Sequence, residues 1–264
     1  MVLLDDDLAT IVAAVREGRG VYDNLRKVVD YLIPGNLAEI LVVVCGLLFI
    51  PALGVPLLPL QLLWINLLTD GLPAVALGVD PSDPALMRRE PRPRAVRLLT
   101  WSRVARLLSR GCVIAAVTLG ALLVARGLLG ASWEQARAVM FTTLVVAQLL
   151  YAFVIAGHGR GVATNPWLLA AVLAGLAAQT LIVLWPDAHQ LFGTAVLSGV
   201  EWVVVVVAAL TSTALLKVGT SVLATSGRST LPRTPPQSDS GRTDRKGVQR
   251  WRRWAQAGSG LRWP

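Results

Sequence analysis

The stretch Gln61–Ala76, QLLWINLLTDGLPAVA, decides the fold. It is apolar enough to lie in a membrane helix, yet it contains three side chains with oxygen atoms, Asn66, Thr69 and Asp70. Their spacing of i, i+3 and i+4 would place all three on one face of an α-helix. A carboxylate near the middle of a bilayer is energetically costly, so Asp70 indicates a functional site.

Pro73 follows directly after this polar cluster. Proline has no backbone N–H, so it deprives the carbonyl four residues earlier of its helical partner and kinks the helix. We expect the freed carbonyls to face a polar cavity. Carboxylate, amide, hydroxyl and carbonyl groups are hard oxygen ligands, which suit Ca²⁺ better than Zn²⁺ or copper. The alternative interpretation is a buried polar cluster that only fixes the packing of helices.

The composition of the whole chain is that of a membrane protein. Of its 264 residues, 54% are hydrophobic and only 16% are charged, and the mean hydropathy is +0.59. Several apolar runs are near the length of about 20 residues that crosses a bilayer. We therefore predict an all-α membrane protein with six transmembrane helices in a bundle, at about residues 29–50, 58–79, 111–129, 138–156, 166–185 and 193–216.

The charged segments set the predicted orientation. An arginine-rich loop over residues 80–110 and a basic tail over residues 218–264 both belong on the cytoplasmic side by the positive-inside rule. The tail carries nine Lys or Arg and two Asp, and its Ser, Thr, Gly and Pro content predicts disorder. Topology accounts for these charges, so we expect the lipid bilayer and no nucleic acid as partner. Six spans place both termini in the cytoplasm.

The first span contains a second polar cluster. Asn36 and Glu39 are three residues apart and so share a helix face, and Glu39 is a second intramembrane carboxylate. We expect Pro34 and Gly35 to interrupt the helix just before them. Upstream, we expect a short separate helix that ends at about Gly18 to Gly20, before the long helix starts near Tyr22.

One run also carries a family resemblance. Asn66–Ala74, NLLTDGLPA, followed by Leu77-Gly78 and Asp80-Pro81, closely resembles the sixth membrane helix of P-type cation-transporting ATPases of the calcium-pump (P2) group. The resemblance covers residues 1–217 but only the C-terminal portion of a pump. It implies a remnant of the cytoplasmic phosphorylation domain over 1–19, a six-helix transmembrane domain over 20–217 that resembles the last six helices of a pump, and the tail over 218–264.

The resemblance also implies a set of ion ligands and a location. Asn36, Glu39, Asn66, Thr69 and Asp70 would bind a transported divalent cation, with Ca²⁺ preferred, in the plasma (inner) membrane. Gln148 falls where some calcium pumps place an acid that completes an ion site. Its amide oxygen is a candidate ligand, and a simple hydrogen bond between helices is the competing interpretation.

The sequence contains none of the pump's catalytic motifs. It has no Asp-Lys-Thr-Gly, no Thr-Gly-Glu, no glycine-rich phosphate loop and no Ser/His/Asp constellation, so we predict no catalytic or cofactor-binding residues. ATP and Mg²⁺ would act only through domains outside this sequence, for example a separately encoded N-terminal pump portion. Whether the chain belongs to an enzyme is left open. The alternative hypothesis is a non-catalytic membrane remnant with a packing or regulatory role.

Overall fold

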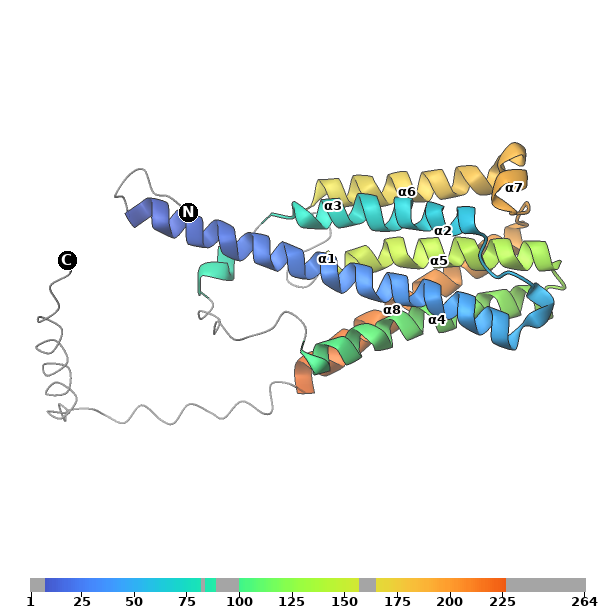
Figure 1. Cartoon of the computed structure of the whole chain (residues 1–264), viewed down its shortest axis with the longest axis horizontal. Coiled ribbons are helices and arrows are strands. Elements are labelled where there is room, and N and C mark those ends of the chain that lie inside the picture. Colours follow the sequence, from blue (N-terminus) through green and yellow to red (C-terminus); the bar gives the residue numbers. More distant parts are fainter. Residues whose placement is uncertain (1–7, 82–83, 89–99, 157–164, 227–264) are drawn as a thin grey trace, which may run out of the picture. The chain divides into compact units, whose positions relative to one another are not determined.

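The computed structural model describes residues 8–81, 84–88, 100–156 and 165–226, and every regular element in these ranges is helical (Figure 1). The elements are, in order, α1 (Leu8–Phe49), η1 (Pro51–Leu53), α2 (Pro59–Ile65), η2 (Asn66–Gly71), α3 (Leu72–Gly78), η3 (Pro84–Arg88), α4 (Trp101–Gly127), α5 (Trp133–Ala156), α6 (Pro166–Leu184), α7 (Pro186–Phe192) and α8 (Gly199–Ser226). Within these ranges, six helical segments are long and apolar enough to cross a membrane. The predicted fold class is confirmed.

The first helix differs from its prediction in two ways. α1 is one continuous helix of 42 residues that passes through Gly18, Gly20 and Pro34, so the predicted breaks at these residues are wrong. A glycine costs a helix only about 1 kcal/mol, which tertiary packing easily offsets. The bond lost at Pro34 is replaced from another helix, as described below. At 1.5 Å per residue α1 is about 63 Å long, roughly twice the thickness of a bilayer's apolar core.

Two other helix boundaries also depart from the sequence prediction. The last span begins at Gly199 rather than near residue 193, because Gly193 takes a left-handed φ of +56° and ends the short helix α7. At its other end α8 extends to Ser226, so residues 218–226 are helical where a disordered tail was predicted. The rest of the tail, residues 227–264, lies outside the described residues. Residues Met1–Ser221 form one compact unit and Val222–Pro264 a second.

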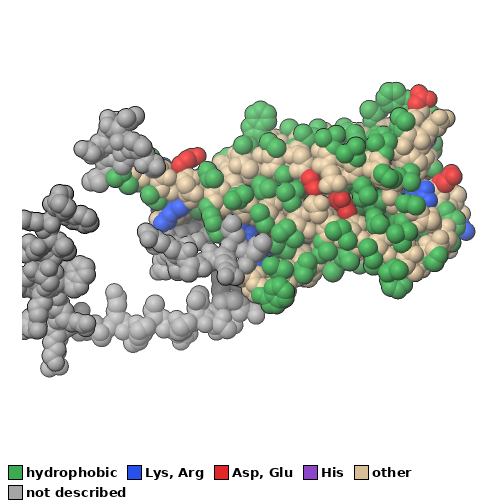
Figure 2. Space-filling view, viewed as in Figure 1, with side chains coloured by type: hydrophobic (Ala, Val, Ile, Leu, Met, Phe, Trp, Pro, Cys, Tyr) green, Lys and Arg blue, Asp and Glu red, His purple; other side chains and the backbone are tan. Residues whose placement is uncertain are grey.

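α5 lies at the centre of the bundle. Of its most apolar window, 83% is buried, against 28–39% for the other five membrane-spanning segments. Its neighbours α1, α4 and α6 pack directly against it (Figure 1). The outward faces of the other helices expose Leu and Val side chains, and Figure 2 shows hydrophobic side chains spread over most of the visible surface of the bundle. Such a surface is suited to lipid, and the chain is an integral membrane protein.

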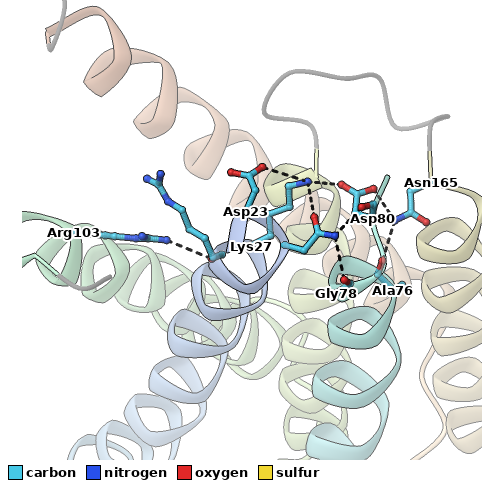
Figure 3. Close-up of polar contacts among 9 residues, drawn as sticks. Asp23, Lys27, Ala76, Gly78, Asp80, Arg103 and Asn165 are labelled. Atoms are coloured by element: carbon cyan, nitrogen blue, oxygen red, sulfur yellow. Dashed lines mark hydrogen bonds and ion pairs between the residues drawn. The ribbon is translucent and has the colours of Figure 1, made fainter. Parts of the chain in front are cut away.

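A polar network joins the end of α3 and the start of α6 to the side of α1 (Figure 3). The last carbonyls of α3 have no partner within the helix. Asn24 of α1 donates to the carbonyls of Gly78 at 3.1 Å and Asp80 at 2.7 Å, and Asn165 donates to the Ala76 carbonyl at 3.0 Å. Asn165 is also the N-cap of α6, where its side-chain oxygen accepts the backbone N–H of Leu168. The network fixes the end of α3 and the start of α6 to one another and to α1 at Asn24.

Two ion pairs reinforce this end of the bundle. Lys27 of α1 contacts the Asp80 carboxylate at 2.5 Å, and the other oxygen of that carboxylate accepts a hydrogen bond from Asn165. Arg103 of α4 contacts Asp30 of α1 at 2.7 Å, and its side chain is only 9% exposed. A half-buried carboxylate with several donors is held in one orientation, so the start of α4 and the end of α3 are both anchored on α1.

Candidate cation site

The polar motif of the second span does not form a regular α-helix. Residues Asn66–Gly71 form a π-helical turn, η2, between α2 and α3. π-Helical turns inside α-helices are rare and occur frequently at functional sites. Within this turn Thr69 is fully buried, Asp70 is partly buried and Asn66 is exposed. The assumption of regular α-helical spacing for these three side chains is wrong, because the segment is π-helical.

Asp70 meets the first span at Asn36. The Asn36 side-chain amide donates to Asp70 Oδ2 at 3.0 Å and to the Leu32 carbonyl of its own helix at 3.1 Å. One turn further along α1, Glu39 is only 5% exposed and accepts a hydrogen bond from Gln148 of α5 at 3.1 Å. Carboxylates from two spans and amides from two spans thus face the same region of the bundle.

Gly35 is the point on which this region converges. A methyl group built on Gly35 would lie 3.7 Å from Gln148 Nε2 and 3.9 Å from Asp70 Oδ1. Gln148 Nε2 also donates to the Gly35 carbonyl at 3.3 Å. Gly35 therefore lies beside the polar groups that α5 and η2 bring to α1. Gly35 was noted in the sequence only as a helix breaker, and its contact with Gln148 was missed.

Gln148 makes the hydrogen bond between helices that one of its two interpretations expects. Its amide nitrogen forms the hydrogen bond between helices, whereas its amide oxygen Oε1 is buried and has no hydrogen-bond partner among the described residues. A buried acceptor without a partner is costly, and the two ends of an amide can exchange places. Turning the amide over would place a bare oxygen beside Glu39, as a cation ligand requires.

The other two predicted ligands, Thr69 and Asn66, bond to carbonyls of their own helix. The Thr69 hydroxyl donates to the Ile65 carbonyl at 2.8 Å, so its oxygen keeps a free lone pair inside the bundle. The Asn66 amide donates to the Leu62 carbonyl of its own helix at 2.8 Å, and no described hydrogen bond joins it to the other predicted ligands. The structure therefore gathers Asn36, Glu39, Asp70 and Gln148, places Thr69 beside them and leaves Asn66 at the surface.

Two tyrosines complete the surroundings of the site. Pro73 has no N–H for the carbonyl of Thr69, four residues earlier, and the Tyr31 hydroxyl of α1 donates to that carbonyl at 2.8 Å. Likewise, Pro34 has no N–H for the carbonyl of Asp30, and the Tyr151 hydroxyl of α5 donates to it at 2.9 Å. The expectation that the carbonyls freed by Pro73 face a polar cavity is thus wrong for Thr69.

The two tyrosine rings stack on each other, with centroids 6.1 Å apart and ring planes at 21°. Together they form what we call the tyrosine clasp, which joins α1, η2 and α5 next to the polar cluster. Sequence analysis missed both residues. A signal was present, because a buried tyrosine hydroxyl needs a partner and two prolines in membrane helices leave two carbonyls without one.

The polar cluster is open on one side. Asn36 and Asn66 are exposed, and Figure 2 shows acidic side chains at the surface in the middle of an otherwise hydrophobic face. Among the described residues no three His, Cys, Asp or Glu side chains come together, so the donor set consists of two carboxylates with amide and hydroxyl oxygens. That set fits a hard cation and not a soft transition metal.

Fold and site together define a helical membrane protein with acidic side chains inside the membrane. Comparison with known sequences gives the family. Residues 54–220 match the family described as "Cation transporting ATPase, C-terminus", and the chain belongs to that family. The match contains Asn66, Thr69, Asp70 and Gln148, whereas Asn36 and Glu39 precede it. The resemblance drawn from the sequence is confirmed.

Two relatives are calcium-transporting ATPases from bacilli. The chain is 36% identical over 214 residues to "Calcium-transporting ATPase" of Bacillus subtilis (strain 168), an alignment that covers 78% of this chain and 23% of that protein. It is 32% identical over 222 residues to "Calcium-transporting ATPase 1" of Bacillus cereus (strain ATCC 10987 / NRS 248), with 76% of this chain and 25% of that protein covered. The chain thus spans about a quarter of the length of these relatives.

Proposed function

We propose that the chain is the membrane-embedded transport part of a cation pump and that its polar cluster binds a divalent cation, with Ca²⁺ as the preferred ion. The observation that carries this proposal is the convergence of Glu39, Asp70, Asn36 and Gln148 around Gly35, in the interior of membrane-spanning helices. The two relatives named above are calcium-transporting ATPases, which supports the choice of ion.

The open side of the cluster supports a further polypeptide segment as partner. Ca²⁺ takes six to eight oxygen ligands, more than these four side chains supply. Lipid tails offer no hydrogen bonds to the exposed amide of Asn36 or to the partly exposed carboxylate of Asp70. Another segment of a pump, present in cis or separately encoded, would cover this side, add ligands and couple the site to ATP and Mg²⁺. We propose that the assembly lies in the plasma membrane.

Calcium titration of the purified chain tests the ligand assignment. We expect weak but measurable binding, because the ligand set is incomplete, and its loss in Glu39→Gln and in Asp70→Asn. The control is Glu201→Gln, which removes another buried carboxylate outside the cluster. Glu201 lies at the start of α8 and accepts a hydrogen bond from the backbone N–H of Ser198. Binding in this variant should equal that of the unmodified chain.

Three results separate the proposal from its rival, a non-catalytic remnant. Equal binding in all four proteins would place the ion elsewhere on the chain and contradict the assignment. If none of them binds, the titration is repeated with an N-terminal pump portion supplied. Binding restored by that partner and abolished by Glu39→Gln supports the pump, whereas a lack of binding in the assembled protein favours the remnant.

A further inference from the structure

A polar cavity lies between α1, α4 and α5, and its lining contains none of the residues of the cation site. Its volume is about 260 Å³. The lining contains two acidic side chains and five basic ones, a net charge of +3, and the basic residues are Arg26, Lys27, Arg103, Arg106 and Arg110. Neither the proposed transport function nor the family match assigns a role to this cavity.

The two carboxylates of the lining do not neutralise its positive charge. Asp30 pairs with Arg103 at 2.7 Å, and Asp23 lies 3.9 Å from Lys27, whose closer partner is Asp80. Because each acid already faces one of these two bases, the cavity retains the charges of Arg106 and Arg110 without a matching carboxylate in its lining. A site of this sign attracts an anion.

The arginines of α4 are arranged to contact one ligand. Arg103, Arg106 and Arg110 are spaced i, i+3 and i+7, so they lie along one face of the helix. Arg110 is oriented by the Tyr151 hydroxyl, to which it donates at 3.3 Å. Arginine binds phosphate through two parallel N–H donors, which makes a row of arginines the usual recognition element for that group.

The position of the cavity points to the membrane surface. Trp101, 86% exposed, opens α4 two residues before Arg103, as expected of an aromatic residue at the boundary between lipid and water. The apolar side chains of Leu107 and Ile155 also line the cavity. The volume is below the roughly 300–1,000 Å³ of pockets that enclose whole small molecules, and it suits a headgroup whose tails lie outside.

We propose that this cavity, the arginine pocket, binds a phosphate group, supplied by the headgroup of an anionic phospholipid or by free phosphate. The three features that carry the proposal are the unbalanced positive charge, the arginine row of α4 and the apolar wall beside it. The tyrosine clasp extends from Arg110 to the carbonyls next to the cation site, so a bound phosphate contacts the same helices that hold the ion ligands.

Lipid binding to the full-length chain tests the pocket. Purified protein in phosphatidylcholine nanodiscs is titrated with spin-labelled phosphatidylglycerol, and the immobilised fraction is measured. Arg106→Gln should weaken the binding about five-fold, the value expected for one basic side chain at an anionic surface. Arg106→Lys, which keeps the charge, should lose less. The matched control is Arg16→Gln, an exposed position on α1 outside the pocket with the same loss of charge.

The outcomes decide both the site and its ligand. Equal weakening in Arg106→Gln and Arg16→Gln would mean that lipid responds only to overall charge, and it would overturn the proposal. Selective weakening in Arg106→Gln supports the pocket. Inorganic phosphate added to the same samples then distinguishes the sources: displacement of the labelled lipid assigns the pocket to phosphate in general, and retention assigns it to the lipid headgroup.

Discussion

At the scale of single residues, the tyrosine clasp explains how two prolines are tolerated beside the candidate site. Each proline removes one hydrogen bond from a membrane helix, and an unpaired carbonyl in a buried position costs about 1–3 kcal/mol. Tyr31 and Tyr151 each replace one of these bonds from a neighbouring helix. The lost intrahelical bonds thereby become contacts between helices, which hold α1, η2 and α5 in one arrangement.

This exchange predicts a specific pattern in a double-mutant cycle. Tyr151→Phe should lower the free energy of unfolding by about 1–3 kcal/mol, because the Asp30 carbonyl loses its partner. In a Pro34→Ala background the restored N–H supplies that carbonyl, so the same substitution should cost much less. Unfolding in mixed micelles measures both values.

Tyr31→Phe is the control for this cycle. The Tyr31 hydroxyl donates to the Thr69 carbonyl, which Pro34 does not affect. The loss of unfolding free energy caused by Tyr31→Phe should therefore be the same with Pro34 and with Pro34→Ala. It should fall only when Pro73→Ala restores an N–H. If the cost of Tyr151→Phe is unchanged by Pro34→Ala, the hydroxyl does not replace the bond that the proline removes.

Sequence spacing identified several residues of the candidate site but not their arrangement. Asn36, Glu39 and Asp70 can be found in the sequence because each is a polar residue within an apolar run, and this can be seen without knowing the neighbouring helices. The π-helical turn that contains Asn66, Thr69 and Asp70 was not predicted, because no sequence pattern indicates such a turn. Gly35 and the tyrosine clasp were missed because their roles consist entirely of contacts between helices, which periodicity along one helix does not reveal.

At the scale of helices, the number of membrane spans was predictable and several of their ends were not. Apolar length alone gave the six spans. The continuity of α1 past Pro34 depends on the Tyr151 hydroxyl of α5, and the start of α4 at Trp101 is accompanied by the contact of Arg103 with Asp30 of α1. Hydropathy carries no information about these contacts. For the same reason the junction of α1, α3 and α6 at Asn165 was not predicted.

Asn165 should therefore contribute more than an ordinary helix cap. Asn165→Ala removes the cap of α6, worth about 1 kcal/mol, and leaves the Ala76 carbonyl without its donor, for a total loss of about 2–4 kcal/mol in the free energy of unfolding. Asn165→Ser keeps a capping oxygen, so it should recover only the contribution of the cap, about 1 kcal/mol. Unfolding in mixed micelles measures these losses.

Thr180→Ala serves as the control for these variants. The exposed Thr180 hydroxyl bonds only to its own helix, so its removal should change the free energy of unfolding by less than about 0.5 kcal/mol. Full recovery of the free energy of unfolding in Asn165→Ser would show that the asparagine acts as a cap alone and does not join the helices.

At the scale of the whole molecule, polar contacts between the segments that connect the helices fall into two groups, one at each end of the bundle. At one end, Asn24 and Asn165 both contact the segment after α3. At the other, Arg137 at the start of α5 donates to the Leu53 carbonyl, and Gln61 donates to the Phe192 carbonyl. Spans that alternate in direction place successive connections at opposite ends of the bundle, and these contacts group the connections in that way.

Reporter fusions test the proposed orientation. Fusions after Gly54, Trp133 and Asp187 should report the outside of the cell, and fusions after Asp80 and Asn165 should report the cytoplasm, because the basic segments stay inside. An enzymatic reporter that is active on one side only gives the result for each site. A reversed pattern at any two of the five sites would contradict the topology, and with it the cytoplasmic position of both termini.

The uninterrupted length of α1 has a mechanical consequence. A rigid helix held over one part of its length behaves as a lever, and Asn24, Lys27 and the tyrosine clasp hold α1 over residues 24–34. The arm from residue 8 to residue 24 measures about 24 Å, so a tilt of about 5° moves its tip by about 2 Å. Asn36 and Glu39 sit just past the fulcrum and shift by only a fraction of this distance, in the opposite direction. A weak force that moves the tip of this arm over a long distance would therefore act on the Glu39 carboxylate as a stronger force over a short distance.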